Sequence, residues 1–589
     1  MSRGGFLFLF LTVLLHNTAG WAQSPPLTYR AITTRAPLPE PALPPLGAAG
    51  YLFRDPVFNT RILRVTDTAT RPSLPNASFT TPSAAHQLAW NATSTMFWVR
   101  SVDGTIIPFT FDPVAMTARR IQPTAAGDGG FTIISQVEPQ FSFVDPNTLY
   151  GSIQDSVDDW PIVRRLDFST RTYTDVLNLG TVTTVNHATY AGALSSSATV
   201  PEKISVMFGG QQDSHYKVAV FNVDAPSGSA VVLDTFSSTI TRQGVVTNTA
   251  AQLGFFLHHA WIDMSGRYVV LTPTAAIPAP YVIWDTAIDT FTFVTTRAEG
   301  HEAAGFGVLL NQSCCTSSTY DGAQWQRRSL ASPNTTTDLI KPVQTPQEIY
   351  IADHTSWNNA RPLEDVPVLS ALYRYSDGNL NTTPWRAWDN ELVAIQTGAG
   401  SAGATVWRFA HHRSDVKYES SGPNQPDVYF WYLPRPNVSP DGRWAIFTSN
   451  WEKSLGNSAT PEPGGQYRCD VFLIALAKGG INTFSDDPLI PGETFVKPVH
   501  LLELRSHIDA QRTRFGLPPY AWTDAQLSSG MFIKAVHVEE LRAALLDAYV
   551  AASRPLPTFL DPMLTPRVTA IKAAHIQGLR DAVNDLENR

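Results

Sequence analysis

Apolar and polar positions alternate over short stretches through most of the chain, from about residue 51 to residue 476. Short apolar runs such as 96–100, 106–111 and 444–448 are separated by turn residues such as Pro440-Asp441-Gly442. A period of two residues bounded by turn signals is typical of β-strands, and no clear helical period lies between these runs. The pattern therefore predicts an all-β sandwich array, barrel or propeller.

One local pattern recurs within this region: an apolar residue, a tight polar turn and then a buried strand. The clearest copy is 437–449, which contains Ser-Pro-Asp-Gly-Arg-Trp-Ala-Ile-Phe, and partial copies occupy 260–271 and 87–99. The Ser-Pro-Asp-Gly form resembles the repeats of TolB-like, PD40-type (WD40-like) β-propellers. This resemblance implies four-stranded blades around a central channel, over residues 49–480.

The spacing of these patterns gives seven candidate blade starts. They lie near His86, Phe141, His187, His259, His301, His354 and Asn437. About 430 residues divided among seven blades is about 60 per blade, which exceeds the 40 to 45 of compact propeller repeats. We therefore expect about seven blades with long loops, and six or eight blades are the alternatives.

The apolar period changes to that of a helix in the last part of the chain. Three copies of the unit Lys-x-x-His-x-x-x-Leu-Arg begin at Lys497, Lys534 and Lys572. A unit this small needs its neighbours to bury its apolar face, so 484–589 is predicted to form one helical module of three loop–helix repeats. It resembles helical repeats appended to the C-terminus of large secreted bacterial proteins. The repetition favours a role at the helix start, rather than chemistry, for one recurring side chain: His500, His537 and His575.

The N-terminus has the features of a secretory signal peptide. Arg3 precedes a largely apolar run of 10 residues, and small residues precede a cleavage point after Ala22. That run is too short to span a bilayer, so 1–22 is predicted to be a signal peptide rather than an anchor, and we expect no transmembrane segment. Residues 23–48 are rich in proline and predict a linker or a strap over the first domain. We expect the mature chain to be exported, to the periplasm or the extracellular space.

Composition and charge narrow the classes of function. The net charge is -8, so nothing indicates the basic face of a nucleic-acid-binding protein. Charged residues number 24 among the 106 residues of 484–589 but 70 among the preceding 483, which supports a separate C-terminal structure. Three cysteines, Cys314, Cys315 and Cys469, are too few for a disulfide scaffold. A vicinal disulfide, a bond from one of the pair to Cys469, and unpaired thiols are the alternatives.

Candidate chemistry rests on histidines that come just before predicted innermost strands. We expect His259, His301 and His354 to surround one mouth of the channel and assign them as candidate ligands of a divalent metal ion such as Zn²⁺ or Mn²⁺. Three further residues complete the candidate channel-mouth site: His411, His412 and Arg413. Arg413 would suit a ligand carboxylate. In the alternative interpretation, each histidine is only a hydrogen-bonding group at its blade start.

Two functions follow from these expectations. The first is an exported binding protein for an extracellular protein or a carbohydrate, with the C-terminal module binding a partner or attaching the chain to the cell envelope. The second is a metal-dependent, glycan-active enzyme, because propeller oligogalacturonate lyases are similar in their Ser-Pro-Asp-Gly repeats and their histidine-rich, metal-bearing channel mouth. That resemblance implies β-elimination next to a uronate carboxylate, but the close Gln-x-x-His-x-His ligand set is absent from this sequence. We favour binding, because catalysis requires a convergence of side chains that a sequence does not show.

Overall fold

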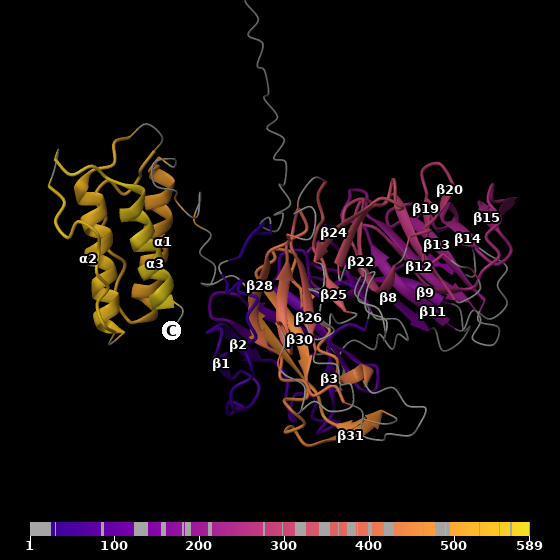
Figure 1. Ribbon diagram of the computed structural model, residues 1–589, viewed down its shortest axis with the longest axis horizontal. Coiled ribbons are helices and arrows are strands. Elements are labelled where there is room, and N and C mark those ends of the chain that lie inside the picture. Colours follow the sequence, from indigo (N-terminus) through magenta and orange to yellow (C-terminus); the bar gives the residue numbers. More distant parts are fainter. Residues whose placement is uncertain are drawn as a thin grey trace, which may run out of the picture.

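The computed structural model describes residues 25–587 with internal gaps. The gaps are 30, 84–86, 123–138, 155–160, 180–181, 183–189, 210–214, 275–276, 278, 297, 313–324, 341–353, 363–364, 374–384, 386, 399–402, 418–428, 463–464, 477–483, 485–488, 490–494, 529–530, 553 and 566–567. Within the described residues, seven sheets of four or more strands form the blades of a propeller, and three α-helices follow them (Figure 1). The predicted fold class and the predicted seven blades are confirmed.

Blades 1 to 3 follow one another along the chain. Blade 1 contains β3 (Phe79–Thr80), β4 (Met96–Ser101), β5 (Ile106–Asp112) and β6 (Thr117–Arg120). Blade 2 contains β7 (Gln140–Phe141), β8 (Thr148–Gln154), β9 (Pro161–Asp167) and β10 (Thr172–Asn178). Blade 3 has six strands, β11 (Tyr190–Ser196), β12 (Lys203–Gly209), β13 (Tyr216–Asn222), β14 (Val231–Asp234), β15 (Thr239–Arg242) and β16 (Val245–Asn248), with the 3-10 turn η2 (Ser227–Ser229) before β14.

Blades 4 to 6 continue in the same order. Blade 4 contains β17 (Leu257–Ile262), β18 (Tyr268–Pro273), β19 (Val282–Asp285) and β20 (Thr290–Phe293). Blade 5 contains β21 (Glu299–Ala304), β22 (Val308–Gln312), β23 (Trp325–Ser329) and β24 (Thr336–Ile340). Blade 6 contains β25 (Thr355–Ser356), β26 (Val368–Leu372), β27 (Glu391–Ile395) and β28 (Val406–His411).

Blade 7 joins the two ends of the propeller. Its strand order is β29 (Asn437–Val438), β30 (Trp444–Ser449), β33 (Asp470–Ala475), β2 (Arg61–Arg64) and β1 (Leu52–Arg54), so the two outer strands come from the N-terminal end. Strand β2 pairs antiparallel with β33, with Leu63 opposite Leu473. The 3-10 turn η3 (Phe430–Tyr432) precedes this blade, and the small hairpin β31 (Asn457–Glu462) and β32 (Gly465–Tyr467) lies between β30 and β33 in the chain.

The first strand of each blade lies nearest the propeller axis, because first strands of neighbouring blades contact one another, as β7 does with β11 and β21 with β25. The observed starts of β7, β17, β21, β25 and β29 fall within a few residues of the predicted starts. In blade 1, β3 begins before the predicted position, and Trp90 adds a bridge to Phe97 on β4. Two of the predicted starts, His86 and His187, lie outside the described residues.

The core lies between neighbouring blades, so both faces of a central strand are buried. Successive side chains of a strand point to opposite faces of the sheet, so those of β30 pack alternately against two neighbouring blades. Trp444 and Ile446 pack in the cluster that includes blade 1, whereas Ala445 and Phe447 pack in the cluster that includes blade 6. Blade strands therefore require near-continuous apolar runs, such as the one seen in the sequence of β30.

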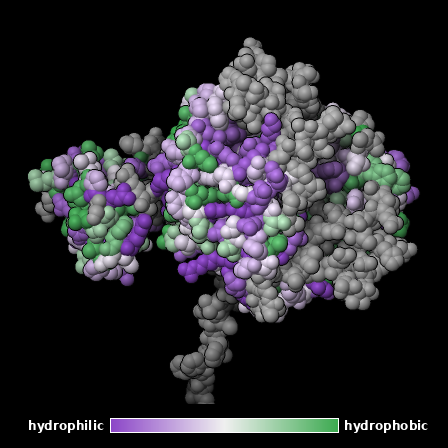
Figure 2. Space-filling model, turned by 90° about the horizontal axis from the view of Figure 1, so that it is seen from below, coloured by the Kyte–Doolittle hydropathy of each residue, from purple (hydrophilic) through white to green (hydrophobic). Residues whose placement is uncertain are grey.

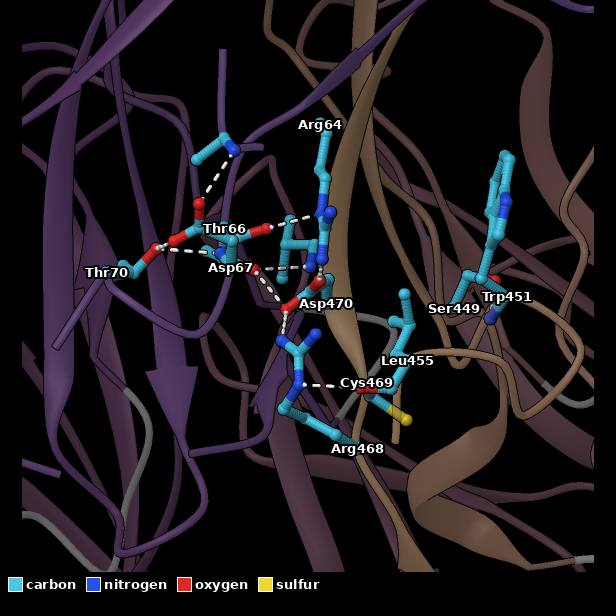
Figure 3. Close-up of polar contacts among 12 residues, drawn as sticks. Arg64, Thr66, Asp67, Thr70, Ser449, Trp451, Leu455, Arg468, Cys469 and Asp470 are labelled. Carbon is cyan, nitrogen blue, oxygen red and sulfur yellow. Dashed lines mark hydrogen bonds and ion pairs between the residues drawn. The ribbon is translucent and has the colours of Figure 1, made fainter. Parts of the chain in front are cut away.

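A buried ionic network joins the N-terminal and C-terminal strands of blade 7 (Figure 3). Arg64, at the end of β2, donates from Nη2 and Nε to Asp470 Oδ2 at 2.5 and 3.0 Å. Thr66 Oγ1 donates to the other carboxylate oxygen at 3.2 Å, and Arg468 also donates to it. The Asp470 side chain is fully buried, and these donors offset the loss of its hydration.

The proline-rich segment 25–48 lies against blades 6 and 7 through its backbone carbonyl groups. Arg408 of β28 donates to the carbonyls of Thr34 and Ala36, both at 2.8 Å. Arg64 of β2 donates to the carbonyl of Gly47 at 2.6 Å. Because a proline-rich segment has few N–H donors, side chains of the blades supply the bonds that its carbonyls need.

The first residues of this segment meet the Ser-Pro-Asp-Gly turn of blade 7. Tyr29 donates from its hydroxyl to the carbonyl of Gly442 at 2.8 Å. Gly442 has a φ of +67°, and a Cβ on it would lie 2.8 Å from Cβ of Pro25 and 2.9 Å from Cδ of Pro26. Glycine is therefore required at this turn both by the backbone conformation and by the proline-rich segment packed on it.

The C-terminal helices are α1 (Pro498–Arg514), α2 (Ala535–Ala551) and α3 (Ala573–Glu587), which lie beside one another (Figure 1). Each recurring histidine is the third residue of its helix start and accepts a bond at Nδ1 from the backbone N–H of the preceding lysine, at 3.2 Å in all three copies. His537 and His575 also bond through Nε2 to Asp524 and Asp561, at 2.9 Å each. These bonds satisfy backbone donors that a helix start leaves without partners.

One arginine on each helix fixes the loop of another repeat. Arg505 of α1 donates to the carbonyls of Thr523 and Asp524, and Arg542 of α2 makes the equivalent pair of bonds one repeat later. Arg580 of α3 lies 4.6 Å from the ring centroid of Phe484, in the first repeat. The third helix therefore contacts the first loop, and the three repeats close into a ring. Among the described residues, no helix is both long enough and apolar enough to cross a bilayer.

The face of the molecule in Figure 2 carries hydrophilic and hydrophobic residues interspersed over both the blades and the helices. Two large apolar side chains are nevertheless strongly exposed at equivalent positions of the helical repeats. Phe495 before α1 is 85% exposed, and Phe532 before α2 is 89% exposed. Their recurrence in two repeats distinguishes them from scattered apolar surface residues.

Replacement of Arg64 by methionine should destabilise the propeller strongly. The change removes one of the two arginines that pair with the buried Asp470 carboxylate and leaves only Arg468, and we expect a loss of about 3 kcal/mol in the free energy of unfolding, measured by urea denaturation. The matched control is Arg242→Met, which breaks an exposed 2.8 Å pair with Asp289 and should cost less than about 1 kcal/mol. Equal losses in the two variants would contradict a special role for the pair in blade 7.

Deletion of 484–589 should leave the propeller folded. The apolar cluster of the helices contains only residues of this segment, so its removal exposes no blade core. We expect the shortened chain to keep a cooperative thermal unfolding transition, followed by circular dichroism. Loss of all cooperative unfolding would show that the boundary between the two parts is misplaced.

Candidate functional site

Two histidines of the propeller, His258 and His259, form a polar cluster with the buried Glu302 between blades 4 and 5. His259 of β17 lies with Nε2 2.8 Å from Oε1 of Glu302 on β21. Trp261 Nε1 and Thr272 Oγ1 each donate to the same oxygen at 3.1 Å. His258, the residue before His259, lies with its Nδ1 2.7 Å from Nδ1 of His259.

Of the other two candidate metal ligands, the structure describes the side chain of His354 but not that of His301. His301 lies in β21, but its side chain is outside the described part of the structure. His354 is buried just before β25, with Nε2 3.1 Å from the carbonyl oxygen of Ser83 and its ring 5.4 Å from that of Phe430. Within the described residues, no three histidine, cysteine, aspartate or glutamate side chains converge as a metal site.

The structure does not bring His411, His412 and Arg413 to the channel. They lie at the end of β28, the outermost strand of blade 6, underneath the segment 25–48. His411 contacts the carbonyl of Leu38 through Nε2 at 2.8 Å, and Arg413 donates to the carbonyl of Pro41 at 2.8 Å. The prediction placed these residues at the channel mouth because the sequence pattern does not distinguish an inner from an outer strand of a blade.

The two histidines at this position are buried in different electrostatic environments. Burial, with smaller effects of the neighbouring His411 and Arg413, lowers the pKa of His412 to about 3, although the bond to the backbone of Leu372 acts to raise it. Its Nε2 lies 2.9 Å from the carbonyl oxygen of Leu372, and its Nδ1 accepts from the N–H of Ser414 at 3.0 Å. Burial also acts to lower the pKa of His411, but the carboxylate of Asp55, with smaller effects of Glu40 and Glu391, raises it above its ordinary value.

A separate hollow lies at the junction of blades 7 and 1 and is lined mainly by aromatic and hydroxyl side chains. Its volume is about 310 Å³, part of it open to solvent. The residues that line it are Ser78, Thr80, Arg100, Val102, Tyr429, Trp431, Tyr432, Ser458, Gly465, Tyr467 and Cys469. We call this hollow the aromatic pocket.

The turn η3 supplies much of the aromatic pocket, and cations hold its rings in place. The Trp431 ring has the guanidinium of Arg100 4.5 Å and that of Arg435 4.9 Å from its centroid. The hydroxyl of Tyr432 accepts from the backbone N–H of Tyr467 at 2.8 Å, which fixes this ring to the β31–β32 hairpin. The rings are therefore positioned before any ligand binds, which lowers the entropy lost on binding.

Two small residues allow the rings of the pocket to pack closely. A Cβ built on Gly465 would lie 2.0 Å from Cε1 of Tyr429, so no larger residue fits without moving that ring. Cys469 is buried, and its thiol donates to the carbonyl of Trp431 at 3.6 Å. The other two cysteines, Cys314 and Cys315, lie outside the described residues, so the predicted disulfide alternatives that involve them stay predictions.

The patterns in the sequence did not predict the aromatic pocket. Its parts come from β3, β4, η3 and the hairpin β31–β32, which are far apart in the chain. The only local signal is the run Tyr429-Phe-Trp-Tyr432, four consecutive aromatic residues directly before blade 7. A continuous aromatic run outside a regular strand is unusual enough to indicate a surface function.

No protein-family model matches this sequence, and no curated protein matches it. Among solved structures, the chain is similar to an oligogalacturonate lyase in complex with manganese, at 13% identity and a TM-score of 0.44, over 73% of this chain and 98% of that one. It is also similar to oligogalacturonate lyase from Vibrio parahaemolyticus, at 10% identity and a TM-score of 0.43, over 72% and 96% of the two chains. For TolB from Acinetobacter baumannii the identity is 10%, the TM-score 0.25 and the coverage 57% and 65%.

All three TM-scores lie below 0.5, so these likenesses carry no argument about chemistry. The propeller assignment rests instead on the strand pairing of this chain, which forms seven sheets in sequence order and closes the last sheet with strands from the N-terminal end.

The free energy of unfolding should depend on pH through His412. Below its ordinary pKa of 6.5 the unfolded chain binds a proton at this residue that the folded chain does not bind. The contribution of His412 to the free energy of unfolding is therefore fully present above pH 6.5, and it is lost as the pH is lowered toward about 3. Between pH 6.5 and pH 5, the native chain should lose about 2 kcal/mol more than a His412→Gln variant, in urea titrations at each pH. Parallel stability curves for the two chains would contradict this.

Proposed function

We propose that this chain is an exported β-propeller that binds a carbohydrate in the aromatic pocket at the junction of blades 7 and 1. The observation that carries the proposal is the set of aromatic rings held in fixed positions around a hollow lined with hydroxyl groups. Sugar rings present flat C–H faces and a rim of hydroxyl groups. Aromatic faces suit the first, and the hydroxyls of Ser78, Thr80 and Ser458 suit the second.

The exposure of the pocket supports a ligand that binds at its rim. The empty space of about 310 Å³ includes solvent at the open mouth of the hollow, so a sugar ring would rest on the rim rather than be enclosed. Trp431 and Tyr467 are partly exposed, whereas Tyr432 is buried. A ligand would therefore lie on Trp431 at the rim, while Tyr432 supports the floor.

The proposal gives the helical module the role of attachment or partner binding. Its support is the pair of strongly exposed phenylalanines, Phe495 and Phe532, at equivalent positions before two of the three helices. Repeated apolar side chains on a rigid ring of helices are suited to a partner that contacts several repeats at once. An extracellular protein and a component of the cell envelope are the partner classes that fit an exported chain.

The alternative, a metal-dependent glycan-active enzyme, needs His259, His301 and His354 to share one ion. His259 already bonds Glu302, and His354 already bonds the carbonyl of Ser83. No described observation favours this alternative over binding. Purified protein that contains stoichiometric metal and cleaves a uronate polymer, with both His259→Ala and His354→Ala inactive, would replace the binding proposal.

Titration calorimetry with a panel of neutral and acidic oligosaccharides tests the proposal. We expect one class of oligosaccharide to bind the full chain, and Trp431→Ala to weaken its binding at least about tenfold, since the aromatic face on which the ligand lies is lost. Trp431→Phe keeps an aromatic face and should retain most of the affinity. Phe236→Ala is the matched control, because Phe236 is an aromatic residue that is 48% exposed on blade 3 and should have no effect.

If none of the oligosaccharides binds, or if Trp431→Ala and Phe236→Ala bind the same oligosaccharide equally well, the aromatic pocket is not the carbohydrate site. An extracellular protein ligand is then the remaining class for the propeller.

A further inference from the structure

The aromatic pocket contains a positive charge. Among the described residues that line it, Arg100 of β4 is the one with a charged side chain, and none is an aspartate or a glutamate. Arg100 is half-buried, so its charge lies close to the apolar rings of the pocket. A hollow with a cation and no anion in its lining has a positive potential, which favours a ligand that carries a negative charge.

The guanidinium of Arg100 has hydrogen-bond donors that no described residue uses. Its contact is with the ring of Trp431, whose centroid lies 4.5 Å from Cζ of Arg100. A cation–π contact of this kind needs none of the five N–H donors of an arginine. The described residues offer this side chain neither a carboxylate nor another acceptor within bonding distance. Arg435, which also lies near the Trp431 ring, is only 2% exposed, so Arg100 is the guanidinium that a ligand can reach.

Other charged groups near the pocket have partners of opposite charge. Asp103, the acidic residue closest to Arg100 in the sequence, pairs with Arg71 at 2.5 Å. Lys453, whose ammonium nitrogen lies 5.5 Å from the centroid of one ring of the pocket, pairs with Asp415 at 3.3 Å. These pairs compensate their own charges and leave that of Arg100 uncompensated within the part of the chain that the structure describes.

The hydroxyl of Thr80 adds a polar group on the same side of the pocket. Thr80 lies opposite Arg100 in the pairing of β3 with β4, and residues directly opposite in an antiparallel pair share one face of the sheet. Thr80 is 4% exposed, and its Oγ1 has no hydrogen-bond partner among the described residues. Because a buried hydroxyl group normally has a partner, this oxygen is suited to a polar ligand that binds beside Arg100.

We propose that the ligand of the aromatic pocket is an acidic carbohydrate, whose carboxylate or sulfate group pairs with the guanidinium of Arg100. This inference rests on the proposed carbohydrate binding and specifies the class of the ligand. Arg100 and Trp431 are in contact, so a sugar ring on the exposed part of Trp431 brings its own substituents within reach of Arg100. Carboxylate and sulfate groups both present two oxygens to the fork of N–H donors of an arginine.

Titration calorimetry of the full chain with matched pairs of tetrasaccharides tests the inference. Hyaluronan and alginate tetrasaccharides supply carboxylates, and their methyl esters are the neutral counterparts. Keratan sulfate and carrageenan tetrasaccharides supply sulfates, and their desulfated forms are the neutral counterparts. We expect an acidic tetrasaccharide to bind at least about tenfold more tightly than its neutral counterpart, because hydrogen bonds between charged groups are stronger than those of neutral groups. The series that binds identifies the anionic group as carboxylate or sulfate.

Substitution of Arg100 separates recognition of charge from support of the Trp431 ring. Arg100→Gln should weaken the binding of the acidic tetrasaccharide at least about tenfold and leave that of the neutral counterpart unchanged. Arg100→Lys keeps the charge but loses the fork of donors, so its affinity for the acidic form should be intermediate. The matched control is Arg119→Gln, which removes an exposed arginine from β6 of the same blade and should change neither affinity.

The contrary outcomes distinguish this inference from the proposed function. If the neutral forms bind the native chain as tightly as the acidic forms, and Trp431→Ala weakens both, carbohydrate binding stands and the preference for an acidic ligand is wrong. If Arg100→Gln weakens both members of a pair equally, Arg100 only supports the ring, and if it weakens neither, Arg100 does not contact the ligand; either result overturns the inference. If no tetrasaccharide of either kind binds, the proposed function itself fails, and this inference fails with it.

Discussion

The joining of the first and last strands in blade 7 is the constraint on which the rest of the propeller depends. Strand β2 pairs with β33 across more than 400 residues of intervening chain, and Arg64 bonds Asp470 at the same point. Closure over so long a segment loses much chain entropy, so the contacts that maintain it have to be strong and dry. The buried carboxylate of Asp470, held by two arginines, is one such contact, because loss of either arginine leaves a buried charge with fewer partners.

The aromatic pocket exists only in the closed propeller. Ser78 and Thr80 come from the start of blade 1, whereas Cys469 comes from the end of blade 7, and the backbone N–H of Cys469 donates to Oγ of Ser78 at 3.0 Å. The inner strands meet at the same junction, where Asn437 bonds the backbone of Gln87 and Ala89. A ligand in the pocket would contact both ends of the propeller, so binding and closure should stabilise one another through linkage.

The sequence predicts the architecture well because each blade repeats a local pattern. Apolar strands and Asp-Gly turns are encoded within a few residues of one another, so blade number and most blade starts could be derived without structural data. The location of side chains across blades could not. His411 and His259 both lie in apolar surroundings in the sequence, yet one belongs to an outermost strand and the other to an innermost strand. Depth within a blade is set by strand order, which is a property of the whole sheet.

A β-bulge at His258, in the pairing of β17 with β18, shows a second limit of the same kind. Consecutive histidines in a strand are expected to face opposite ways, and the sequence offers no sign that one extra residue in the pairing turns them together. The pocket is a third case, because its rings are adjacent in sequence but the surfaces they meet come from the other end of the propeller. Local patterns thus define the elements, and non-local pairing creates the candidate sites.

In the propeller and in the helical module alike, the first and last structural elements contact each other. In the propeller, Arg64 and Asp470 connect the first and last structural elements. In the helical module, Arg580 of the third repeat lies over Phe484 of the first, and the backbone of Leu489 donates to the side chain of Gln577. A closed ring leaves no terminal repeat with an unpaired apolar face, and therefore needs no capping element. Closure in both parts explains how a chain of short repeated units forms two compact structures. The exposed phenylalanines of the helical module lie outside its core and are therefore available for contact with a partner.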